Sequence, residues 1–123
     1  MSQAPHTTAR PVLTHTLGFP RMGARRALKF ALESFWRGDS TATDLLGNAA
    51  QLRQQHWQIQ ADAGLGFVTV GDFALYDHVA NHIQLLGCEP ARFALGADTP
   101  ELDRYFAMAR GVSAKAVHAH TDC

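Results

Sequence analysis

Four cationic side chains gather in the first part of the chain: Arg21, Arg25, Arg26 and Lys29. A helical pattern of apolar residues begins at Leu28, so these cations precede or occupy the first turns of a helix, where the positive end of the helix dipole disfavours them. Arg25 and Lys29 are four residues apart, a spacing at which like charges repel. The placement becomes favourable if an anion binds there, since helix N-termini and guanidinium groups both hold anions. The alternative is a solvated basic helix start, with Glu33 as a partial charge partner for Lys29.

Two acidic residues form a second candidate, at residues 71–78. Asp72 directly follows an apolar run that is typical of a buried strand, and polar residues at that point of a parallel α/β fold face the binding crevice. Asp72 is therefore a candidate for orienting a ligand or a basic side chain. The alternative, which we favour, is that both acids have structural roles, with Asp77 for example as a first-turn acid that stabilises the N-terminus of a helix.

Histidines supply two weaker candidates. His78 and His82 are four residues apart, which suits two ligands of one metal, but no third ligand type lies at a supporting offset. Because His82 falls on a predicted apolar face, we expect a packed or hydrogen-bonded histidine. Residues 118–123 contain ligand types in a segment without a structural pattern, which we attribute to composition. No nucleophile elbow, phosphate-binding loop or Cys-x-x-Cys motif occurs, so no catalytic residue and no metal ligand is predicted.

Composition limits the partners. The chain has 123 residues, of which 46% are hydrophobic and 18% charged, which is ordinary for a globular domain with a core. The formal net charge is zero, so nothing global points to nucleic acid or an anionic membrane. No apolar run approaches the roughly 20 residues of a membrane span, and residues 1–11 lack the apolar region of a secretory signal. Two cysteines make no disulfide framework. A cytoplasmic protein with reduced thiols is expected.

Apolar periodicity predicts four helices and two strands. The helices are expected at residues 28–36, 41–63, 75–86 and 99–109, and the strands at residues 12–19 and 67–70. Thr41 and Asp44 have capping-box spacing, Gly38 suits the end of the first helix, and Thr99 suits an N-cap before Pro100. The predicted buried face of the second helix is Leu45, Ala49, Leu52, His56 and Ile59. That of the third helix is Leu75, Val79, His82, Ile83 and Leu86.

The predicted order of elements indicates the fold class. Strand, helix, helix, strand, helix, helix is typical of an α/β protein with a parallel sheet. Two strands can neither close a barrel nor fill a doubly wound sheet, so the architecture looks incomplete.

Several segments resemble the start of cobalamin-independent methionine synthases. They are HTLGFPRMG at residues 15–23, RALKFALESFW at 26–36, GDFA at 71–74, YDHV at 76–79, LLG at 85–87, PAR at 90–92 and YFAMARG at 105–111. The segments occur in the family's order and cover residues 13–111. The resemblance implies an incomplete (β/α)8 barrel, helix-rich and limited to the first βα units. It divides the chain into a disordered tail (1–11), a barrel segment (12–111) and a divergent C-terminal tail (112–123).

The same resemblance implies a function. The family transfers a methyl group from 5-methyltetrahydropteroyl-polyglutamate to homocysteine, with zinc held in a second barrel by ligands that this chain does not contain. The family's binding span for the folate polyglutamate tail maps onto Arg26, Ala27, Leu28 and Lys29, and the neighbouring arginines add positive field. A polyglutamate is a chain of carboxylates, which now favours the anion-binding interpretation of the cationic cluster. Without the zinc barrel, the chain alone is expected to be inactive.

Two departures from the family pattern matter. Ala27 stands where the family often has Glu, which removes a local charge partner. After Gly111 the resemblance stops, and Lys115 does not lie in the family's later Lys motif, so no role is transferred to it. Three hypotheses therefore remain. The chain is an N-terminal fragment of the enzyme, a non-catalytic module that binds folate or anions or complements a separately encoded C-terminal barrel, or a truncated gene remnant.

Overall fold

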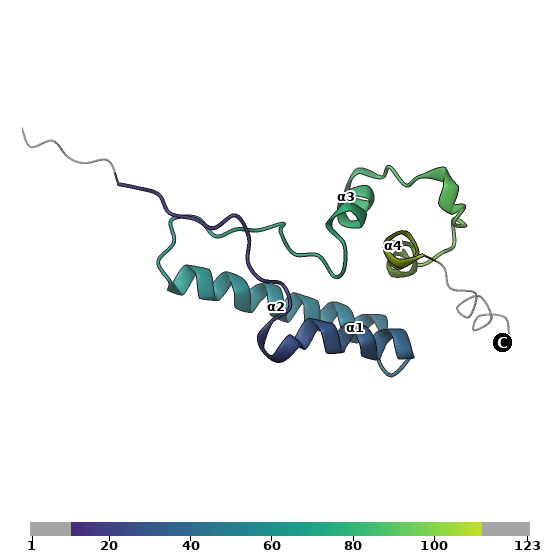
Figure 1. Ribbon diagram of the computed structural model, residues 1–123, viewed down its shortest axis with the longest axis horizontal. Coiled ribbons are helices and arrows are strands. Elements are labelled where there is room, and N and C mark those ends of the chain that lie inside the picture. The colour runs from purple at the N-terminus through teal and green to yellow at the C-terminus, as the bar shows by residue number, and fades with distance from the viewer. Residues whose placement is uncertain (1–10, 112–123) are drawn as a thin grey trace, which may run out of the picture.

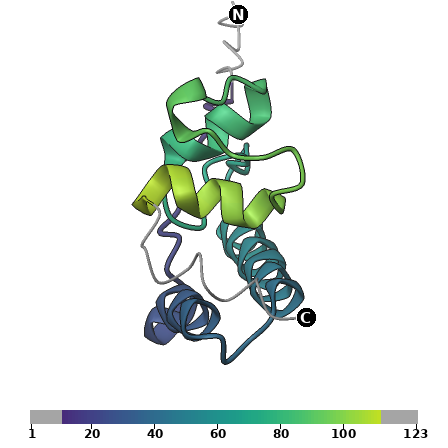
Figure 2. The ribbon, with the colours of Figure 1, turned by 90° about the vertical axis from the view of Figure 1, so that its right-hand side faces the viewer.

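Helices dominate the part of the chain that the structure describes. The structure is a computed structural model that describes residues 11–111. In chain order its elements are η1 (Ala24–Arg26), α1 (Ala27–Arg37), α2 (Ala42–Asp62), α3 (His78–Leu86), η2 (Ala91–Phe93) and α4 (Glu101–Arg110). The long helix α2 lies antiparallel to α1, and α3 and α4 pack together beside this hairpin (Figures 1 and 2). All four predicted helices are therefore confirmed as elements.

Local sequence signals set the helix ends in the first hairpin. Gly38 ends α1 with φ = 80°, a left-handed conformation that glycine adopts without strain. The capping box that begins α2 is confirmed: Asp44 N–H donates to the Thr41 hydroxyl (3.1 Å), and Thr41 N–H donates to the Asp44 carboxylate (2.9 Å). These hydrogen bonds from Thr41 lower the pKa of Asp44.

The second hairpin begins later than predicted. Helix α3 starts at His78 rather than near residue 75, and Asp77 is its N-cap, with the carboxylate accepting from Ala80 N–H at 2.8 Å. The structural interpretation of Asp77 is therefore confirmed. In α4 the cap position is Pro100, so the prediction of Thr99 as N-cap is wrong by one residue. The Thr99 carbonyl accepts a hydrogen bond from Arg104 Nε (3.2 Å), which holds the preceding loop against α4.

The two segments predicted as strands do not form strands within residues 11–111. They do run beside each other, and Phe67 N–H donates to the Thr14 carbonyl at 3.1 Å. That is the backbone hydrogen bond between them, and side chains add the rest: Thr69 Oγ1 donates to the Thr16 carbonyl, and Gly66 N–H donates to Thr14 Oγ1 at 3.3 Å. Two paired segments are marginal without a further strand or a covering layer, so one bonded pair does not extend into a ladder.

Apolar contacts join the two hairpins in one core. The buried residues are Leu28, Leu32, Leu45, Leu52, Ala80, Tyr105 and Phe106. Phe106 lies against both Phe35 (ring centroids 5.8 Å apart) and Trp36 (5.5 Å), so α4 packs on α1 through aromatic rings. The Tyr105 hydroxyl accepts from Asp77 N–H at 2.7 Å, which fixes the start of α3 to the same core.

The predicted buried faces of two helices need correction. On α2, His56 is buried as predicted, but Ile59 is 53% exposed and Gln60 is only 2% exposed. On α3, Ala80 is buried while Val79 is 67% exposed. The face of α3 that meets the core is therefore displaced by one residue from the predicted one, from Val79 to Ala80. The shift on α2 has a polar cause.

Gln60 holds both extended segments against α2. Its Oε1 accepts from Thr69 N–H (3.1 Å) and from Thr16 Oγ1 (3.3 Å), and its Nε2 donates to the His56 carbonyl (3.2 Å). A buried amide is satisfied only when its donors and acceptor find partners. The hydrogen bonds of its amide explain why Gln60 is buried while the neighbouring Ile59 is exposed.

Replacing Gln60 by alanine is expected to lower the free energy of unfolding by about 2 kcal/mol, because Thr69 N–H loses its buried partner. Chemical denaturation measures the change. The matched control is Gln58→Ala on the same helix, whose amide reaches only Asp62 (2.7 Å) at the surface and is expected to cost less than about 0.5 kcal/mol. Equal effects of the two changes would contradict the role of Gln60.

His56 makes the fold sensitive to acid. The imidazole is 6% exposed and lies 4.7 Å from the Phe19 ring, between centroids. Burial lowers the pKa of His56 below its ordinary value of 6.5, and the nearby Asp72 carboxylate opposes part of that shift. The unfolded state therefore binds more protons than the folded state at mildly acidic pH.

Stability is accordingly expected to be complete above the ordinary histidine pKa and to fall as the pH drops through the lower pKa of folded His56. Unfolding free energies measured between about pH 7.5 and pH 5 test this. His56→Gln is expected to flatten the dependence over that range, and an unchanged slope in this variant would assign the effect to other groups.

Candidate functional site

A strained turn precedes α1 and carries the cationic cluster. Gly23, Arg25 and Arg26 all have positive φ, at 71°, 53° and 60°. Each non-glycine residue in this conformation costs roughly 1–2 kcal/mol, and such residues concentrate at functional sites. The turn is closed by a hydrogen bond from Leu28 N–H to the Met22 carbonyl (3.0 Å).

Gly23 packs closely on α2 in addition to having a positive φ. A Cβ atom here would lie 2.5 Å from Leu52 Cδ2, so the turn rests directly on α2. The contact joins the cationic turn to the middle of the second helix.

The four residues of the predicted tail-binding span lie in different environments. The side chains of Arg26 and Lys29 are exposed, whereas Leu28 is 0% exposed and packs in the core. Leu28 therefore offers a ligand no side-chain surface, and Ala27 offers only a methyl group. Of the four, the two cations alone can bind an anion through their side chains.

Charge pairing differs between these two cations. Lys29 Nζ lies 3.5 Å from the Glu33 carboxylate, a half-exposed i,i+4 pair that contributes little. The ion pairs found within residues 11–111 include neither Arg25 nor Arg26. The two arginines of the turn are thus held in a fixed backbone geometry with uncompensated charge.

Arg21 serves a different purpose from the other cations. Its Nη1 donates to the carbonyls of Leu75 (2.7 Å) and Ala74 (3.2 Å), in the segment that leads into α3. The guanidinium therefore ties the start of the chain to the second hairpin instead of adding to the field of the turn.

The acidic candidate Asp72 meets a distant motif. Its Oδ2 accepts from Phe19 N–H at 2.7 Å, across 53 residues of sequence. Around this contact lies an open hollow of about 610 Å³, lined by Leu17, Gly18, Phe19, Pro20, Gly71, Asp72, His78 and His82. The structure thus brings together the two sequence motifs at residues 18–20 and 71–72, and it gives Asp72 a structural hydrogen bond.

The histidine pair at this hollow is exposed, so packing on a buried face is wrong for His82, and the alternative expectation, a hydrogen-bonded His82, is the one confirmed. Its Nδ1 lies 2.7 Å from the His78 carbonyl, the contact expected for a residue one helical turn away. In the part of the chain that the structure describes, no three His, Cys, Asp or Glu side chains could hold a metal ion. These residues do not fit zinc, and residues 118–123 lie outside the described range.

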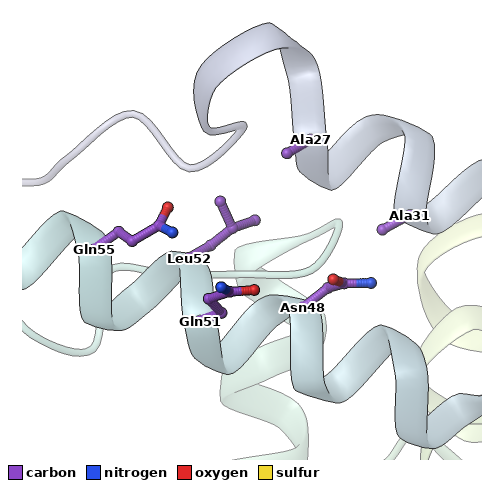
Figure 3. A pocket seen from close by; sticks show the side chains of 6 residues that line it. All are labelled: Ala27, Ala31, Asn48, Gln51, Leu52 and Gln55. Carbon is purple, nitrogen blue, oxygen red and sulfur yellow. The ribbon is translucent and has the colours of Figure 1, made fainter.

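A groove between α1 and α2 was not foreseen from the sequence. It has a volume of about 270 Å³ and is lined by Ala27 and Ala31 from α1 and by Asn48, Gln51, Leu52 and Gln55 from α2 (Figure 3). The sequence signal was the concentration of glutamines in α2, which a search for apolar periodicity ignores.

Large apolar side chains are exposed along the paired extended segments. We call this set the edge patch: Val12 (87%), Leu13 (61%), Leu17 (93%), Phe67 (56%) and Val70 (66%). Exposed apolar side chains on two neighbouring segments leave surface that a further strand or a partner could cover. Within residues 11–111, no helix is long and apolar enough to cross a membrane.

The sequence comparisons agree on one family. Residues 13–121 match the family described as the N-terminal domain of cobalamin-independent synthase. The chain is 58% identical over 102 residues to the 5-methyltetrahydropteroyltriglutamate–homocysteine methyltransferase of Paraburkholderia phytofirmans, and 49% identical over 102 residues to that of Syntrophotalea carbinolica. A third relative of the same name, from Ralstonia pickettii, is 54% identical over 97 residues.

These alignments cover 79–83% of this chain but only 12–14% of the length of the relatives. The chain therefore corresponds to a small part of a much longer protein. The family match continues past Gly111, where the recognisable motifs end. The resemblance inferred from the sequence motifs is confirmed, and the chain belongs to the cobalamin-independent methionine synthase family, of which it carries part of the N-terminal domain.

Proposed function

We propose that this chain contributes the binding site for the polyglutamate tail of the folate substrate in a methionine synthase. The observation that carries the proposal is the strained turn before α1, which presents Arg25 and Arg26 without ion-pair partners among the described residues. The relatives' name specifies a triglutamate-bearing methyl donor. Each glutamate adds a carboxylate, and guanidinium groups bind carboxylates well.

The proposed role in the reaction is binding and orientation. The family transfers a methyl group from the folate to homocysteine, and zinc in another barrel would favour the thiolate form of homocysteine, the nucleophile of the reaction. Anchoring a remote, non-reacting part of a substrate helps to place its reactive end. This segment would thereby support methionine biosynthesis, in the cytoplasm, without itself carrying a reacting group.

The proposed architecture is the opening of an incomplete (β/α)8 barrel. Residues 12–19 and 67–70 would become neighbouring strands once further strands flank them, since they already lie side by side through the Phe67–Thr14 hydrogen bond. Helices between and after them fit the alternation of a parallel barrel.

The double change Arg26→Ala with Lys29→Ala is expected to weaken binding of methyltetrahydrofolate triglutamate about 10- to 100-fold, because charge-assisted hydrogen bonds are lost. Titration calorimetry at two salt concentrations measures the affinity, and binding of the monoglutamate form is expected to change less. The control removes the same charge elsewhere on the surface, with Arg37→Ala and Arg92→Ala. If both double variants weaken binding equally, a general field and not this turn attracts the substrate.

A second candidate function is complementation of a separately produced remainder of the enzyme. The edge patch favours it, because five large apolar side chains on two neighbouring segments are left uncovered. If the remainder of the enzyme is absent, a stably folded chain would be a non-catalytic binding module, and a chain without a stable fold would be a gene remnant.

Mixing the chain with the remainder of the Paraburkholderia phytofirmans relative is expected to restore methyl transfer if this candidate holds. Leu17→Asp with Val70→Asp is then expected to abolish the restored activity while leaving the unfolding of the free chain nearly unchanged. Leu46→Asp, at an exposed α2 position (51%) outside the edge patch, is the control. Restored activity that survives the double change would exclude the edge patch as the contact surface.

A further inference from the structure

The groove between α1 and α2 has a neutral, amide-rich lining. Asn48, Gln51 and Gln55 come from α2 at spacings of three and four residues, which places them along one stripe of the helix. Opposite them, Ala27 and Ala31 leave the space open, and Leu52 reaches between the helices (Figure 3). No charged side chain lines the groove.

The three carboxamides are available to a ligand. All three residues are exposed, and the hydrogen bonds found within residues 11–111 involve none of their side chains. Gln58 and Gln60 on the same helix, by contrast, are both engaged, with Asp62 and the His56 carbonyl. A carboxamide has a donor and an acceptor group, so it pairs well with another amide.

The cationic turn lies at one end of this groove. Gly23 rests on Leu52, and Figure 3 shows the chain turning above Gln55 and Leu52 before it enters α1. A ligand that extends from Arg25 and Arg26 along the groove would therefore meet Gln55 first and Gln51 and Asn48 after it.

Helix geometry places Lys29 on another side of α1. Side chains two residues apart on a helix differ by about 200° around the axis, so Lys29 points away from the flank that carries Ala27 and Ala31. Its contact with Glu33, one turn further along, lies on that opposite flank. The charges of Arg26 and Lys29 are thus not equivalent for a ligand in the groove.

We propose that the α1–α2 groove binds the amide backbone of the γ-linked glutamates, with carboxylate contacts from the Arg25–Arg26 turn. This inference rests on the proposed function and names the subsite that distinguishes a polyglutamate from a simple polyanion. A volume of about 270 Å³ lies below the range of about 300–1,000 Å³ typical of sites for whole drug-sized ligands. A groove of this size suits a short peptide-like segment better than the complete folate.

The test compares Gln51→Ala with Gln55→Ala against a matched control, Gln54→Ala with Gln58→Ala. The control residues have the same type, spacing and helix, are exposed, and lie outside the groove. The readout is the ratio of the dissociation constants for methyltetrahydrofolate monoglutamate and triglutamate. The groove variant is expected to lose about tenfold of the preference for the triglutamate, and the control less than about twofold.

Two further measurements separate amide recognition from charge. Butanetetracarboxylate, which carries carboxylates and no amide, is expected to bind the groove variant as it binds the unchanged chain. Ala31→Leu, which fills the groove without altering any amide, is expected to reduce the triglutamate preference as well. Circular dichroism and thermal unfolding confirm that each variant keeps its helices.

The outcomes distinguish this inference from the function on which it rests. A triglutamate preference that survives in the groove variant, while Arg26→Ala reduces it, overturns the groove and leaves the proposed function standing. No triglutamate preference in the unchanged chain overturns both. A loss in the groove variant together with unchanged binding in Lys29→Ala supports the assignment of Arg26 and Lys29 to different flanks.

Discussion

The arrangement of the N-terminal segment depends on one buried amide, that of Gln60. Without strand neighbours, the two extended segments have little backbone pairing of their own, and the Gln60 carboxamide supplies the missing partners for Thr16 and Thr69. A helix side chain thus replaces the pairing that a continuous sheet would share among many backbone groups. Gln60 thereby joins the segment that leads into the cationic turn to α2, the hydrogen bonds of Thr14 and Phe19 add to this contact, and Arg21 ties the segment to the second hairpin.

The turn itself stores strain that the core must offset. Two successive arginines with positive φ together cost a few kcal/mol, and no hydrogen bond of their side chains within residues 11–111 repays that cost. What holds them is the apolar packing on either side, chiefly Leu28 at the start of α1 and Leu52 beneath Gly23. A solvated basic helix start would need no such geometry. Strain combined with unpaired charge is the physical reason to prefer a binding role.

Features set by residues close in sequence, such as helix caps, could be predicted. Features that depend on contacts between distant segments could not. The capping box at Thr41 and the glycine end of α1 depend only on residues within one turn, and both are confirmed. The prediction of strands at residues 12–19 and 67–70 is wrong for the described residues because a stable sheet needs flanking strands, which two short segments alone do not supply. Gln60 was overlooked because periodicity arguments assign buried positions to apolar residues, and here Ile59 points outward instead.

The candidate site likewise has a part that the sequence predicts and a part that only the packing of the helices shows. Motif resemblance identified the cations at residues 26 and 29, but only the packing of α1 on α2 shows that Lys29 lies on the flank of α1 away from the groove and that Leu28 is buried. The α2 residues of the groove lie at positions 48–55, between the short motifs that first indicated the family but within residues 13–121, which match it. If the groove recognises amides as proposed, substitutions on one stripe of α2 would change the preference for the length of the tail, while the cations of the turn would keep their place.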